Sequence, residues 1–178
     1  MTTQLNAKQL RDLAETQQLS PIKHRPLYLI LDNIYDTYNI GGLFRLADAL
    51  AMERLYICGD SETPPNHRIQ KASVGTYKVV KWTYRNAASE AIEELQKEVQ
   101  HIQVVSIELT ESAIPYTAFD FKLPCALVVG NETLGVSEAA LKASDAVVKL
   151  PMYGYNTSLN VIVSAAVVAY EAVAHSKK

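Results

Sequence analysis

The sequence has little of what metal centres, disulfide frameworks and nucleotide-phosphate loops require. Its two cysteines and four histidines are scattered, without Cys-x-x-Cys or His-Glu-x-x-His spacing, so we expect no bound metal and two buried, reduced thiols. A Gly-x-Gly-x-x-Gly fingerprint, a phosphate loop ending in Gly-Lys-Ser/Thr and a Gly-x-Ser-x-Gly elbow are also missing. These absences argue against several common classes of metalloenzyme, nucleotide-phosphate enzyme and serine hydrolase.

Neither charge nor a long apolar run points to a membrane or to non-specific coating of nucleic acid. The formal net charge is −2. The N-terminus lacks the basic start and apolar core of a secretory signal, and the most apolar segment, residues 159–174, is shorter than the roughly 20 residues that cross a bilayer. With 48% hydrophobic residues, the chain is expected to form one cytoplasmic domain over residues 1–178.

Apolar runs alternate with helical patterns along the chain. Strands are expected at residues 27–31, 55–58, 78–84, 102–109, 125–129 and 146–150. Helices are expected at residues 6–19, within an N-terminal arm formed by residues 1–25, and at 41–50, 86–100 and 159–174. Asn39 and Ser158 are plausible N-caps of the second and fourth helices. The alternation predicts an α/β fold with a mostly parallel sheet covered by helices on both faces.

Two turn-rich loops, residues 130–135 and 151–157, follow two of the expected strands directly. Ligands of open parallel sheets bind outside the carboxyl ends of the strands, so the functional site is expected there. The polar groups and apolar walls of these loops suit an adenosine-type pocket better than a pyrophosphate site. Gly41 and Gly42 weaken the start of a helix by up to about 1 kcal/mol each, which indicates close approach of a backbone or ligand.

A second group of residues leaves two interpretations open. His67, Arg68 and Lys71 precede a turn of small residues, which is compatible with phosphate binding or with a solvated surface loop. Lys81 and Trp82 lie in the expected 78–84 strand, where they could stack on bases or pack, and packing is favoured for Trp82.

Three motifs resemble those of the SpoU (TrmH) family of RNA ribose 2′-O-methyltransferases, in the SPOUT class. They occupy residues 39–45, 129–137 and 150–161 in the family's order, with Ser73-Val74-Gly75 as a weaker fourth element, and the similarity spans residues 27–171. The resemblance implies a SPOUT fold with a C-terminal trefoil knot. It also implies S-adenosylmethionine as cofactor, tRNA or rRNA as partner, and a homodimer through the C-terminal helix, which here is apolar nearly all round.

The resemblance also implies roles for individual residues. The catalytic set is Asn39, Arg45, Glu132, Ser158 and Asn160. The cofactor set is Leu127, Val129, Gly130, Leu150, Met152, Ser158 and Leu159. The expected RNA-binding set joins Arg45 of the first motif to four basic residues outside the motifs, which are assigned by their charge and not by the resemblance: His67, Arg68, Lys71 and Lys81. Because a guanidinium stays protonated in proteins, we expect Arg45 to grip a phosphate and orient the ribose rather than act as a general base. Leu46 stands where the family often has threonine.

Two rival hypotheses fit parts of the pattern. The same knotted fold could serve as a non-catalytic RNA-binding module, although the complete catalytic set argues against this. The second hypothesis is a nucleotide-binding enzyme with a doubly wound α/β fold, and the missing glycine fingerprint argues against it. The sequence does not specify which RNA or nucleotide is modified.

Overall fold

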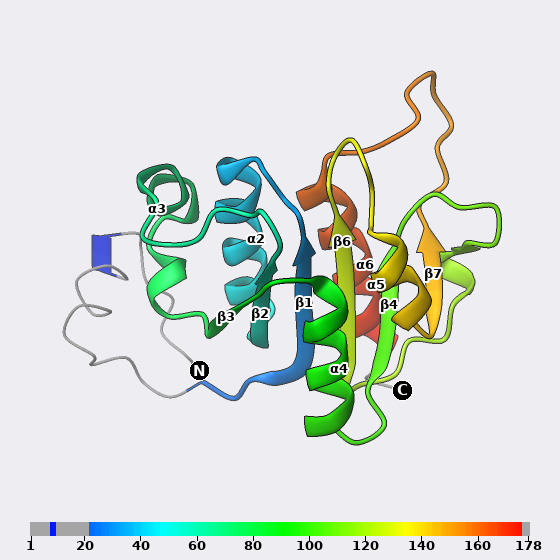
Figure 1. Ribbon diagram of the computed structural model, residues 1–178, viewed down its shortest axis with the longest axis horizontal. Helices are drawn as coiled ribbons and strands as arrows, with labels where there is room; N and C mark the ends of the chain where they lie inside the picture. The colour runs from blue at the N-terminus through cyan, green and yellow to red at the C-terminus, as the bar shows by residue number, and fades with distance from the viewer. Residues whose placement is uncertain (1–7, 10–21, 176–178) are drawn as a thin grey trace.

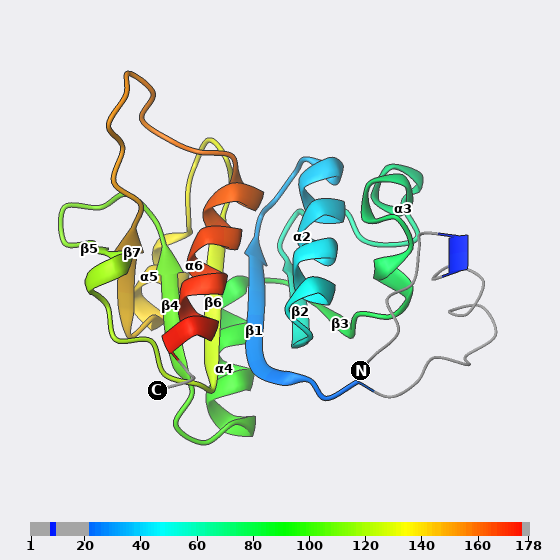
Figure 2. The same ribbon diagram turned by 180° about the vertical axis from the view of Figure 1, so that it is seen from behind.

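The fold is built on a seven-stranded sheet with the order β3-β2-β1-β6-β4-β7-β5, in which all neighbouring strands are parallel (Figures 1 and 2). The computed structural model describes residues 8–9 and 22–175. The strands are β1 (Arg25–Asp32), β2 (Met52–Cys58), β3 (Trp82–Arg85), β4 (Gln103–Ile107), β5 (Ile114–Pro115), β6 (Cys125–Gly130) and β7 (Ala146–Lys149). The helices are α2 (Thr37–Ala49), α3 (His67–Ser73), η1 (Thr76–Lys78), α4 (Ala88–Glu98), η2 (Tyr116–Ala118), α5 (Glu138–Ala143) and α6 (Val161–His175).

The central strand β1 is buried on both faces, as its continuous apolar run predicts. Because side chains alternate across a strand, Leu27, Leu29 and Leu31 enter the core layer beneath α2 and α6. Tyr28 and Ile30 enter the opposite layer, beneath α4 and α5. Figures 1 and 2 show the two helical layers from opposite sides. The predicted α/β fold with a parallel sheet between helices is therefore confirmed.

The glycine pair of α2 lies where two other elements approach the helix. A Cβ added to Gly41 would lie 2.5 Å from the Cβ of Ala72 and 2.9 Å from the backbone nitrogen of Ser73, both at the end of α3. A Cβ added to Gly42 would lie 2.3 Å from Cδ1 of Ile162 on α6. The sequence-based expectation of a close approach is confirmed, and the approaching groups are α3 and a side chain of α6.

Replacing Gly41 by alanine should destabilise the protein more than replacing Gly42. At Gly41 the backbone of α3 must move, and overpacking of this kind costs about 1–3 kcal/mol, which exceeds the gain of about 1 kcal/mol in helix propensity. At Gly42 only the flexible tip of Ile162 must turn away. Urea unfolding of both variants measures the difference, and equal stabilities would contradict the tight α2–α3 contact.

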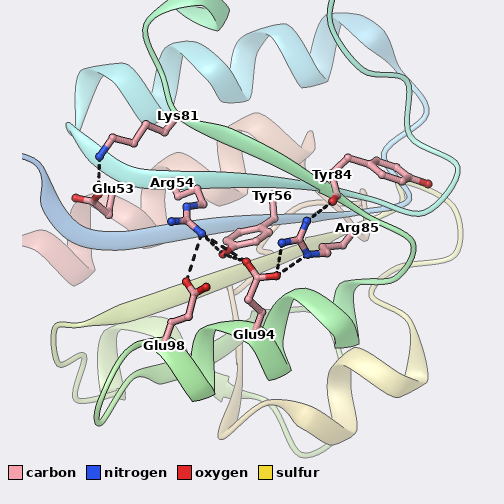
Figure 3. A network of polar contacts seen from close by, with 8 residues as sticks. All are labelled: Glu53, Arg54, Tyr56, Lys81, Tyr84, Arg85, Glu94 and Glu98. Atoms are coloured by element: carbon pink, nitrogen blue, oxygen red, sulfur yellow. Dashed lines mark hydrogen bonds and ion pairs between the residues drawn. The ribbon is translucent and has the colours of Figure 1, made fainter.

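A polar network ties α4 to strands β2 and β3 (Figure 3). The hydroxyl of Tyr56 donates to Oε1 of Glu94 at 3.0 Å and accepts from Nη1 of Arg54 at 2.9 Å, while Arg85 pairs with the other oxygen of Glu94. Burial raises the pKa of Tyr56 to about 12, so its hydroxyl keeps its proton at neutral pH. Glu98 adds an outer contact to Arg54 at 3.4 Å. These residues fix the covering helix and lie apart from the motif loops.

Two predicted helix caps are wrong. Helix α2 begins at Thr37, and its N-cap is Asp36, whose Oδ1 accepts from the backbone N–H of Tyr38 at 2.8 Å. Asn39 lies within the first turn, and its side chain is used for contacts with other loops. Helix α6 begins only at Val161, so Asn160 rather than Ser158 supplies the capping oxygen, at 2.9 Å from the N–H of Ile162.

Other boundaries also differ from the sequence-based expectation. Strand β3 covers only Trp82–Arg85, because η1 occupies the start of the expected 78–84 strand. The predicted packing role of Trp82 is confirmed by its edge-on contact with Phe44, at a ring-centroid distance of 6.4 Å. Helix α3 replaces the surface loop considered for residues 67–71. The helix expected at residues 6–19 lies outside the described residues, apart from positions 8 and 9.

No helix in the described ranges 8–9 and 22–175 is long and apolar enough to span a membrane. The strand order does not by itself fix how the chain threads, so the trefoil knot stays a prediction.

Candidate active site

A tight loop follows β6 at the carboxyl edge of the sheet. The backbones of Asn131 and Gly135 exchange two hydrogen bonds, of 3.0 and 2.8 Å, and Gly135 has a φ of +72°. The side chain of Asn131 closes the loop from inside, because its Oδ1 accepts from the N–H groups of Thr133 and Leu134 at 2.8 and 2.9 Å. A Cβ on Gly130 would lie only 2.2 Å from the backbone nitrogen of Val136, so the strand end and the loop return are in direct contact.

Two acidic residues that the sequence analysis missed hold this loop in place. Oδ2 of Asp32, at the end of β1, accepts from the N–H of Ser137 at 2.7 Å. Oε2 of Glu108, just after β4, accepts from the N–H of Val136 at 2.8 Å. In the sequence, each of these acidic residues directly follows an apolar run. That position, at the end of an expected strand, is the signal that could have identified them. Because both carboxylates accept from backbone N–H groups, they position the loop from the two strands that flank β6.

A cavity of about 320 Å³ opens between this loop and the loop after β7. Its size falls in the range of small-molecule sites, roughly 300–1,000 Å³. Six of the seven predicted cofactor residues line it, namely Val129, Gly130, Leu150, Met152, Ser158 and Leu159. Leu127 is not among the lining residues, since its side chain is fully buried in the core. Apolar side chains beside exposed loop backbone suit an adenosine-like ligand.

Three predicted catalytic residues form one hydrogen-bonded chain. Nδ2 of Asn160 donates to Oδ1 of Asn39 at 3.0 Å, and Nδ2 of Asn39 donates to Oε1 of Glu132 at 2.5 Å. The residues come from the segment before α6, from α2 and from the β6 loop. Glu132 also lines the cavity, so the chain links the first turn of α2 to the cavity wall.

The other two predicted catalytic residues stand apart from this chain. Ser158 lines the cavity, but no hydrogen bond joins it to another of the described residues. Arg45 is exposed on α2, about 9 Å along the helix axis from Asn39, and its side chain forms no hydrogen bond or ion pair with the described part of the chain. Asn39 and Glu132 therefore orient each other, and neither anchors Arg45.

The predicted RNA-binding residues fall into two places. His67 and Arg68 line a second cavity at the carboxyl edge, and Lys71 is exposed farther along α3. Lys81 precedes β3 and pairs with Glu53 at 2.8 Å (Figure 3), so it lies at the opposite, amino-terminal edge of the sheet. Parallel strands place these two edges at opposite ends of the sheet, which separates Lys81 from the predicted RNA-binding residues of α3.

Both cysteines are buried and free, as the sequence analysis predicts. Burial raises the pKa of Cys58 and of Cys125 to about 12, so both remain thiols at neutral pH. Over residues 8–9 and 22–175, no group of three or more histidine, cysteine or acidic side chains is placed to hold a metal ion.

The sequence matches the model of the SpoU rRNA methylase family over residues 26–170. This chain belongs to that family. Among its relatives, the tRNA (guanosine(18)-2′-O)-methyltransferase of Aquifex aeolicus is 28% identical, over 93% of this chain and 74% of the relative. The 23S rRNA (guanosine-2′-O-)-methyltransferase RlmB of Ralstonia nicotianae is 32% identical, over 87% of this chain and 61% of its own length. The SpoU resemblance of the three motifs is therefore confirmed.

Solved SpoU structures share the fold. The methyltransferase AviRb of Streptomyces viridochromogenes, in complex with the cofactor AdoMet, superposes with a TM-score of 0.77 at 28% identity, over 86% of this chain and 62% of AviRb. The TrmH/SpoU tRNA modifying enzyme of A. aeolicus superposes with a TM-score of 0.76 at 25% identity, over 95% of this chain and 81% of that enzyme. This SpoU chain thus spans about three fifths of RlmB and AviRb and a larger share of the A. aeolicus enzyme.

Proposed function

We propose that this protein methylates a ribose 2′-hydroxyl of tRNA or rRNA, using S-adenosylmethionine. The observation that carries the proposal is that the second and third SpoU motifs line the same cavity. Asn39 of the first motif donates a hydrogen bond to Glu132 in the wall of that cavity. The named relatives modify tRNA or rRNA at the ribose of guanosine, and AviRb binds AdoMet, which supports both the reaction and the cofactor.

The residues that line the cavity fit S-adenosylmethionine. Leu150, Met152 and Leu159 provide apolar walls for an adenine ring, and the strand end at Val129 and Gly130 offers backbone groups for its polar edge. When bound, the cofactor supplies a methyl group already activated by its sulfonium. The protein therefore has to align the ribose oxygen with that methyl group and to exclude competing water.

Alignment falls to the catalytic set. The chain of Asn160, Asn39 and Glu132 holds the first turn of α2 at a fixed distance from the cavity. Ser158 lies in the cavity wall and contributes a hydroxyl toward the cofactor or the ribose. Arg45, charged at all physiological pH values, grips the phosphate beside the target ribose from the exposed face of α2. His67, Arg68 and Lys71 extend this RNA surface over α3, whereas Lys81 serves a separate, more distant contact.

The catalytic unit is proposed to be a cytoplasmic homodimer of single knotted domains, joined through α6. Val163 and Tyr170 of this helix are 47% and 55% exposed, and the partly buried Val167 lies between them on the same face. An apolar stripe at this spacing is more than the core of one protomer needs, and a self-complementary contact would cover it. Because α2 packs beside α6 through Gly42 and Ile162, Arg45 would lie near such an interface.

The test is methyl transfer from labelled S-adenosylmethionine to unmodified tRNA and rRNA transcripts, followed by mapping of 2′-O-methyl sites. We expect label in RNA and, in cells, sites that disappear when the gene is deleted. Transcripts carrying a 2′-deoxy nucleotide at the mapped site should accept no label. Cofactor binding without labelled RNA would instead favour the non-catalytic RNA-binding module.

A further inference from the structure

A second cavity, of about 490 Å³, lies at the same edge of the sheet as the proposed active site. It is formed by the segment between β1 and α2, by the β2–α3 connection and by the start of α3. The lining residues are Tyr35, Asp36, Thr37, Glu62, Asn66, His67 and Arg68. None of the three SpoU motifs contributes to this cavity, so it is distinct from the cofactor cavity.

The charges of this cavity do not suit a phosphate group. Asp36 and Glu62 supply two carboxylates, against the single permanent positive charge of Arg68. A phosphate would be repelled by this excess of negative charge. A ligand that presents N–H donors on one edge and acceptors on another would satisfy both kinds of side chain.

We propose that this cavity binds a guanine base of the substrate RNA, an inference that rests on the proposed function. Guanine carries two adjacent donors, N1–H and the 2-amino group, which one carboxylate can accept together. Its O6 and N7 acceptors match the donor fork of Arg68, a pairing common in nucleic-acid recognition. The other RNA bases do not combine two adjacent donors with that acceptor pair.

Glu62 is the carboxylate that meets the donor edge. Asp36 is already engaged, because its Oδ1 caps α2 by accepting from the N–H of Tyr38. Glu62 is exposed and forms no hydrogen bond or ion pair within the part of the chain that the structure describes. Tyr35, which is 51% exposed, offers a ring on which the base stacks.

The cavity is close enough to the proposed active site to read a nucleotide at or next to the target ribose. Thr37 lines it, and Asn39 of the catalytic chain lies two residues farther along the same helix, a rise of about 3 Å. Asn33 also joins the β6 loop to the segment that leads to Glu62, since it accepts from Asn131 Nδ2 at 2.9 Å and from the N–H of Asp60 at 3.0 Å. A base held here would place its strand across the first turn of α2.

The test compares 5′-GMP with 5′-IMP, which lacks only the 2-amino group, by NMR titration of the full-length protein. We expect GMP to shift the amide signals of residues 35–37 and 62–68, and to bind about tenfold or more tightly than IMP, since a charge-assisted hydrogen bond is lost. Glu62→Gln should remove most of that preference. Glu111→Gln, which deletes the same charge on an exposed loop elsewhere, should leave it unchanged.

Cofactor binding and methyl transfer are measured on the same preparations, so that the two proposals can fail separately. Equal affinity for GMP and IMP, or an unchanged preference in Glu62→Gln, overturns the guanine site even when the wild-type protein methylates RNA. A GMP preference that depends on Glu62, in a protein without methyl transfer, keeps the site and overturns the enzyme. Unchanged S-adenosylmethionine affinity in Glu62→Gln excludes a general folding defect.

Discussion

Replacing Arg45 by alanine is expected to lower methyl transfer to RNA by about 10²–10³-fold, comparable to the loss of one preorganised hydrogen-bond donor in an active site, because the phosphate beside the target ribose is no longer held. Affinity for S-adenosylmethionine should stay within a factor of two or so, because Arg45 does not line the cofactor cavity and has no partner among the described residues. Single-turnover methylation and calorimetric titration of the cofactor measure the two quantities.

Two further variants make the role of Arg45 specific. Arg45→Lys keeps the charge and loses the two-pronged geometry, so it should recover only part of the lost rate. Lys97→Ala removes an exposed cation from α4, where the side chain is 79% exposed, and should leave the rate unchanged. A collapse of cofactor affinity in Arg45→Ala would show that the residue supports the cavity rather than the RNA.

Replacing Gly130 by alanine is expected to abolish cofactor binding and to destabilise the protein. The added Cβ would lie 2.2 Å from the carbonyl carbon of Gly135 and from the backbone nitrogen of Val136, and neither backbone atom can turn away as a side chain would. The loop must open, which breaks its hydrogen bonds and displaces Glu132 from Asn39. Overpacking alone costs about 1–3 kcal/mol in the free energy of unfolding.

Gly154 provides the matched control for Gly130. It lies in the loop after β7, and a Cβ added to it would meet nothing within 4 Å. Gly154→Ala should therefore leave the free energy of unfolding unchanged in urea titrations. If Gly130→Ala unfolds at the same urea concentration and binds the cofactor normally, the tight packing of the β6 loop against the strand end is not required.

The sequence predicted the scaffold better than the contacts within the site. Apolar runs identified five of the seven strands of the sheet, because burial leaves a continuous apolar stretch, and alternation of polar and apolar residues identified the half-exposed edge strand β3. The strand β5 was not predicted, because its two residues are too few to show a periodic pattern of apolar side chains. Both helix caps were wrong because Asn39 and Ser158 are good capping residues by type, whereas the helices begin where Asp36 and Asn160 reach the free N–H groups.

The amino-acid sequence by itself determined the sheet's two-sided burial, the loops at its carboxyl edge and membership of the SpoU family. Only the tertiary structure decided which side chains meet there. Asn39 contacts Glu132 and Asn160, which lie 93 and 121 positions away along the chain, and Asp32 and Glu108 support the same loop from two strands. Local periodicity records which face of an element is buried, but the strand order and the crossovers between strands determine which loops become neighbours.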